Sequence, residues 1–124
     1  SAVQINGGGG VVQNCEVFNC QWGVVFSSGE TELRNNTLYD CADVGLTVKD
    51  GRPTIVGNLI FDCYNGGVVL DKGTGGVIED NKLYFARDDG ALTIHPAATA
   101  IQNNRNTVKN AFSPPKDKPY AERQ

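Results

Sequence analysis

The sequence predicts an all-β solenoid in which short strands wind into about five similar coils. Three observations support this fold class: a repeat of about 22 residues, Gly and Asn that recur between short apolar segments, and no sustained run of apolar residues at helical spacing. The 124 residues include 15 Gly and twelve Asn. Because these turn-favouring residues are spread along the chain, we expect one domain of repeated strands and turns.

The repeat is clearest in the first apolar residue of one strand of each coil, which recurs at Val12, Leu33, Ile55, Ile78 and Ile101. This period is too short for a propeller blade, and the repeat lacks the helix of leucine-rich or ankyrin units. The pattern predicts a parallel β-helix, whose coils stack about 4.8 Å apart so that equivalent residues form columns. We place the coils near residues 1–22, 23–44, 45–66, 67–89 and 90–112, followed by a polar tail at 113–124.

The columns predict which side chains face the interior. Apolar residues alternate with more polar ones along each strand, so the apolar columns point inward. They are Val24/Leu46/Val68/Leu92, Phe26/Val48/Leu70/Ile94, Leu33/Ile55/Ile78/Ile101 and Leu38/Ile60/Leu83. We expect Phe112, Pro114 and Pro115 to cap the C-terminal end of this core, because the end of a solenoid exposes apolar surface.

A column of asparagines lies between two of the strands, at Asn36, Asn58, Asn81 and Asn104. Their amides can donate and accept hydrogen bonds along the stack and can pair with buried turn backbone. We therefore predict a buried asparagine ladder.

These motifs resemble a known repeat family. A leading Gly-Val-x-Val is followed by Pro53-Thr54-Ile55 in one coil and by Gly76-Val77-Ile78-Glu79-Asp80-Asn81 in the next. Over residues 2–108 the pattern resembles the right-handed parallel β-helix repeats (CASH/NosD-like), found in NosD-like periplasmic proteins, many polysaccharide-active enzymes and F-box proteins, and it is closest to the F-box repeats. The resemblance implies a right-handed β-helix. It implies no particular activity, because the shared residues are structural.

Two columns are expected to face outward and are our candidate binding surfaces. The first is the aromatic column, which we interpret as a stacked ladder or as a platform for a protein or a sugar. The second lies on a strand face that is less polar than solvent requires. The candidate binding residues are Phe18, Tyr39, Phe61 and Tyr84 in the aromatic column, and Val25 and Val69 beside Thr47 and Thr93 on the strand face.

Asp40 and Asp62 align one coil apart beside Asn19. Carboxylates about 5 Å apart raise the pKa of one another and could share a proton or bind Ca²⁺. The alternative is that both side chains extend into water. His95, the only histidine, is expected at the surface near Asp71, and we assign no catalytic residue.

Four cysteines would permit disulfides, but Cys20, Cys41 and Cys63 share one column, and Cys15 occupies the position that Asn36 has one coil later. We expect four packed, free thiols, although stacked Cα atoms near 5 Å would also permit a bridge. Free thiols, together with a first segment unlike a secretion signal, favour a cytoplasmic location.

The net charge is −3, with Lys and Arg scattered along the chain, so we expect neither nucleic acid nor a membrane as a partner. No cofactor motif is recognisable. The function classes left open are a protein-binding or scaffold module, a carbohydrate-active enzyme or carbohydrate-binding module, and a self-assembling structural element. We favour the non-catalytic binding module, because the recurring residues all serve folding.

Overall fold

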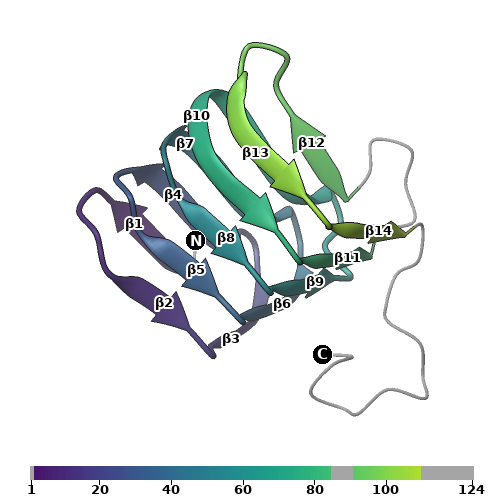
Figure 1. Cartoon of the computed structure of the whole chain (residues 1–124). Helices are drawn as coiled ribbons and strands as arrows, with labels where there is room; N and C mark the ends of the chain where they lie inside the picture. Colours follow the sequence, from purple (N-terminus) through teal and green to yellow (C-terminus); the bar gives the residue numbers. More distant parts are fainter. Residues whose placement is uncertain (1, 85–90, 110–124) are drawn as a thin grey trace.

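The computed structural model describes residues 2–84 and 91–109, and within these ranges all regular structure is β. The coils stack in chain order, from the purple first coil to the yellow-green fifth coil in Figure 1. Among the described residues there is no helix long and apolar enough to cross a membrane. The expected cap of Phe112, Pro114 and Pro115 lies outside the described residues.

Each of the first three coils contributes three strands, and the fourth coil joins two of them into one long strand. The strands are β1 (Val3–Asn6), β2 (Val11–Gln13), β3 (Glu16–Cys20), β4 (Val24–Ser28), β5 (Glu32–Arg34), β6 (Thr37–Cys41), β7 (Val44–Gly51), β8 (Thr54–Val56), β9 (Leu59–Phe61), β10 (Gly66–Glu79), β11 (Lys82–Tyr84), β12 (Leu92–Ile94), β13 (Ala100–Asn104) and β14 (Thr107–Lys109).

Every pairing between these strands is parallel and joins one coil to the next. The first sheet has the order β1-β4-β7-β10-β12, the second β2-β5-β8-β10-β13 and the third β3-β6-β9-β11-β14. The long β10 therefore belongs to both the first and the second sheet. The arrangement confirms the predicted parallel β-helix of about five coils.

The predicted interior columns are buried in the central coils. Phe26, Val48 and Leu70 are at most 1% exposed, and Leu38, Ile60 and Leu83 at most 3%. Full burial of such side chains stabilises the fold by about 1.5–3 kcal/mol each. In the first and fifth coils the apolar residues are only half-buried and pack against the edge of the core: Val3, Ile5, Val12, Val17, Leu92, Ile94 and Ile101.

The register of the fifth coil differs from the predicted one. Ile101 pairs with Gly76, and Ile78 pairs with Asn103, so the column Leu33/Ile55/Ile78/Ile101 is wrong at its last member. The first strand of this coil is in the predicted register, since Leu92 pairs with Val68. The shift arises after this strand, in the turn that follows it. This turn, in which Ala98 N donates a hydrogen bond to His95 O, lengthens the coil.

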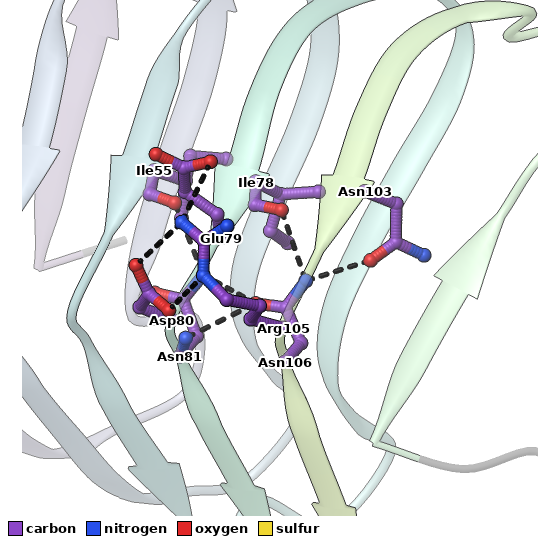
Figure 2. Close-up of polar contacts among 8 residues, drawn as sticks. All are labelled: Ile55, Ile78, Glu79, Asp80, Asn81, Asn103, Arg105 and Asn106. Carbon is purple, nitrogen blue, oxygen red and sulfur yellow. Dashed lines mark hydrogen bonds and ion pairs between the residues drawn. The ribbon is translucent and has the colours of Figure 1, made fainter.

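The asparagine ladder is present, but its last member is Asn106 rather than Asn104. Asn58 Nδ2 donates to Asn81 Oδ1 at 3.0 Å. Asn81 Nδ2 in turn donates to Asn106 Oδ1 at 2.8 Å (Figure 2). Asn104 is exposed and ends β13, where it pairs with Glu79. The predicted ladder residue, Asn104, comes two residues too early in the chain because the same turn is longer than predicted.

The residue before each ladder position adopts a left-handed backbone conformation. Its φ is 55° at Asn14, 55° at Asn35, 70° at Gly57, 56° at Asp80 and 53° at Arg105. Asn, Asp and Gly tolerate this conformation best, which explains their recurrence at this corner.

Arg105 is the exception in this series, and ion pairs hold its side chain across the corner. Its Nε and Nη2 contact the two oxygens of Asp80 at 2.8 and 3.1 Å, and Nη2 lies 3.4 Å from Glu79 Oε2 (Figure 2).

Candidate functional site

The aromatic column lies on the third sheet and is stacked, but most of it is not accessible. The ring centroids of Phe18 and Tyr39 lie 5.1 Å apart, as do those of Tyr39 and Phe61, and the rings of both pairs are nearly parallel. Phe18 is 46% exposed, whereas Tyr39, Phe61 and Tyr84 are 7, 3 and 7% exposed and form a cluster separate from the core. The expectation of an open aromatic platform at these three residues is therefore wrong, and the column is a packed ladder.

The outward column of the first sheet borders a pocket of about 350 Å³, here called the first-sheet pocket. Val25 is buried at 9% exposure, and Val69 is half-buried. Ladder pairing aligns Gln4, Val25 and Thr47 in three successive coils. The lining residues are Gln4, Trp22, Val25, Thr47 and Lys49.

The first-sheet pocket combines an indole ring and an aliphatic side chain with polar groups. Trp22 lies in the turn between β3 and β4, and the exposed Lys49 extends from β7. Thr47 Oγ1 is buried and has no hydrogen-bond partner among the described residues. Sequence reasoning missed Gln4, Trp22 and Lys49. The available signal was that the only Trp of the chain stands in a corner turn next to an outward column.

A second concave surface, here called the second-sheet groove, measures about 420 Å³. It is more polar than the first-sheet pocket. Gly75 leaves space for the Arg52 side chain, because a Cβ at position 75 would lie 3.2 Å from Arg52 Nη1. Arg34 Nη2 contacts Glu32 Oε1 at 2.8 Å. The lining residues are Glu30, Glu32, Arg52, Thr54, Gly76, Val77, Ala100 and Gln102. Sequence reasoning missed this groove because it considered the outward columns of the first and third sheets and not that of the second sheet.

Asn19, Asp40 and Asp62 occupy a left-handed corner with φ between 52° and 55°. Asp40 is exposed, while Asp62 is half-buried and its Oδ1 has no hydrogen-bond partner among the described residues, so this carboxylate does not simply extend into water. Burial, and next the charge of Asp40, raise the pKa of Asp62 to about 6. Over the described ranges no three His, Cys, Asp or Glu residues are placed to hold a metal ion, and the Ca²⁺ site at Asp40 and Asp62 stays a prediction.

The four cysteines are free thiols in this structure. Cys15 is exposed, and its backbone N donates to Asn36 Oδ1 at the first position of the ladder. Cys20, Cys41 and Cys63 stack at the end of the third-sheet strands, as predicted.

His95 is exposed, and its Nδ1 accepts a hydrogen bond from Ala97 N at 3.0 Å. The ring therefore stabilises its own turn, which is the turn that lengthens the fifth coil.

The comparisons with known proteins agree with this geometry. Residues 1–113 match the family described as the right-handed beta helix region. Neither the curated proteins nor the solved structures gave a significant match to the chain. The family match covers most of the sequence, and the stacked parallel coils are the architecture that it describes. The chain therefore belongs to the right-handed β-helix family.

Proposed function

We propose that the chain is a non-catalytic binding module that presents the first-sheet pocket to a protein partner. The composition of this pocket carries the proposal. The ring of Trp22 and the side chain of Val25 lie beside the ammonium of Lys49 and the amide of Gln4. Aromatic anchors within a polar rim are typical of the centres of protein interfaces.

The fold supports this role because it holds the pocket rigid. Val25 pairs with Gln4 on one side and with Thr47 on the other, so strand register sets their spacing. A preformed surface loses little conformational entropy on binding.

The chemistry of the pocket favours binding over catalysis. Its described lining contains one ammonium and no carboxylate, imidazole or thiol, so it lacks a pair of groups for general acid and base catalysis.

A second candidate, a carbohydrate-binding or carbohydrate-active function, rests on the second-sheet groove. Two carboxylates, those of Glu30 and Glu32, line that groove together with Arg52. Paired carboxylates are the usual groups of glycoside hydrolysis.

Site-specific photo-crosslinking in extracts of the source cells tests the first proposal. A benzophenone amino acid in place of Lys49 should give an adduct with another protein that Trp22→Ala abolishes and Val108→Ala leaves intact. Val108 is a suitable control because it is 47% exposed and belongs to β14, in the fifth coil. No adduct at position 49, or equal adducts in both variants, would contradict the proposal.

Two other outcomes identify the alternatives. An adduct of two copies of this chain would instead favour self-assembly. Binding to an oligosaccharide array that Glu30→Gln abolishes would favour the carbohydrate function.

A further inference from the structure

Three thiols stack in one column where the strands of the third sheet end, and the sulfur atoms of Cys20 and Cys41, at the accessible end of the column, are close enough to react. Cys20 of β3 and Cys41 of β6 are ladder partners, and their sulfur atoms lie 3.5 Å apart. Cys20 is half-buried, whereas Cys41 and Cys63 are 2 and 1% exposed. A reagent from solvent therefore reaches this column through Cys20.

The strands already meet the geometric requirement for a disulfide. Paired residues of neighbouring strands have Cα atoms about 4.8 Å apart, and disulfides span about 4.4–6.8 Å between Cα atoms. The two sulfur atoms need only approach from 3.5 Å to about 2 Å, by rotation of the side chains.

We propose that Cys20 and Cys41 form a reversible disulfide by exchange with a low-molecular-weight disulfide of the glutathione type. The Cys20 thiolate attacks one sulfur of glutathione disulfide, its S–S bond breaks, and one glutathione leaves as Cys20 becomes a mixed disulfide. The Cys41 thiolate then attacks the Cys20 sulfur and releases the second glutathione. Two protein thiols are oxidised, one glutathione disulfide is reduced to two thiols, and the two cysteine protons end on these thiols.

The surroundings determine the rate of this exchange. Burial, and next the hydrogen bond with Cys41, raise the pKa of Cys20 to about 11. The hydrogen bond with Cys63, and next burial, raise the pKa of Cys41 well above its usual range. Because the thiolate is the nucleophile, the pair should react slowly at neutral pH, and the rate should rise about tenfold per pH unit from pH 7 to 9.

The other two cysteines are poor partners for Cys20. Cys63 lies two coils away from Cys20. Its sulfur is packed against Gly45, because a Cβ at position 45 would lie 3.0 Å from Cys63 Sγ. Cys15 lies outside the column, and its sulfur donates to Gln13 O at 3.3 Å. The exposed Cys15 is therefore the matched control.

A bridge between Cys20 and Cys41 would tie the first coil to the second. Trp22, the only Trp of the chain, follows Cys20 by two residues, so its fluorescence should report the oxidation.

The test is mass mapping of the full chain after incubation with graded ratios of oxidised to reduced glutathione, acid quenching and alkylation. Cleavage at Glu16, Arg34 and Lys49 separates all four cysteines. We expect linked Cys20 and Cys41 peptides that have lost two hydrogens, reversal by dithiothreitol, a melting temperature higher by several degrees, and a changed Trp22 emission.

The variants distinguish the steps of the exchange. Cys15→Ala should bridge as the parent does, Cys41→Ala should stop with glutathione on Cys20, and Cys20→Ala should form no bridge to position 41. Circular dichroism checks that each variant is folded. The disulfide map of the parent chain tests the proposal without any of these variants. A bridge that involves Cys15 or Cys63, or four free thiols at ratios that oxidise the urea-unfolded chain, would overturn the proposal.

Discussion

Asn58 links three coils through a single buried amide. Its Nδ2 donates to Leu33 O at 2.9 Å and to Asn81 Oδ1 at 3.0 Å, and its Oδ1 accepts from Asn36 N at 2.9 Å. Replacement by Leu leaves buried donors and acceptors unpaired, each at a cost of about 1–3 kcal/mol. We expect Asn58→Leu to lower the free energy of unfolding by about 3 kcal/mol, measured by urea denaturation.

The matched control is the same substitution at Asn104, which is exposed and lies outside the ladder. Asn104→Leu should change the free energy of unfolding by less than about 0.5 kcal/mol. Equal losses in the two variants would mean that the ladder is assigned wrongly.

Asp62 makes the stability depend on pH. Its pKa is raised to about 6 from 3.8, so the folded chain binds this proton more tightly than the unfolded chain does. The resulting stabilisation is complete below about pH 4 and is lost as the pH rises through 6. Asp62→Asn should therefore stabilise the chain at pH 7.5, by about 1 kcal/mol after allowance for solvent screening of this half-buried group, and should give no gain at pH 4.

Melting curves of the Asp62→Asn variant at the two pH values measure this difference. Asn tolerates the left-handed backbone, as Asn19 does in the same column. Asp40→Asn is the comparison, and it should give a smaller gain because the charge of Asp40 is the second cause of the shift. A gain for Asp62→Asn that is the same at both pH values would contradict this explanation.

Close contact between neighbouring coils depends on the glycines near the start of the first-sheet strands, such as Gly45 in β7. A Cβ at Gly45 would lie 2.8 Å from Ile60 Cγ2, 3.0 Å from Cys63 Sγ and 3.0 Å from Gly67 O. Gly45→Ala should therefore cost about 1–3 kcal/mol through overpacking, measured by thermal or urea unfolding.

Gly9 offers a control for the same substitution, because a Cβ there meets nothing within 4 Å. Gly9→Ala should be neutral or slightly stabilising. If Gly45→Ala unfolds at the same urea concentration as Gly9→Ala, the coils approach less closely than described.

Stability across the whole molecule should follow the stacking of the coils. The first coil pairs with the second alone, and its Val3, Ile5, Val12 and Val17 are half-buried, whereas Val48 in the third coil is fully buried. In a solenoid each coil is stabilised by its neighbours. We expect the amides of β1–β3 to open at a free energy at least about 2 kcal/mol lower than those of β7, measured by native-state hydrogen exchange. Uniform protection from β1 to β7 would contradict this gradient.

Much of the architecture can be predicted from the sequence, because a single repeat length sets the position of every column. The inward columns through Phe26 and Leu38 and the asparagines at 36, 58 and 81 all follow from one register. Prediction failed where that register changes. Ile101 resembles a core residue and Asn104 a ladder residue, but the turn at His95 moves both by two positions.

The candidate surfaces could be predicted only in part. Alternation identifies which side chains leave the interior, but it does not reveal how closely they pack against one another, and so the burial of Tyr39 and Tyr84 was missed. The first-sheet pocket and the second-sheet groove join residues of several coils with corner residues such as Trp22, whose placement depends on turn geometry.

The sequence by itself determined that the chain is a parallel β-helix with a packed core, an asparagine ladder and a column of three cysteines. The reason is that these features need only equal spacing between coils, and the repeat specifies this spacing. The tertiary structure decided the register of the fifth coil, the burial of the aromatic ladder, the two concave surfaces and the 3.5 Å approach of Cys20 and Cys41. These features depend on turn lengths and on side-chain positions across coils, which the period does not specify.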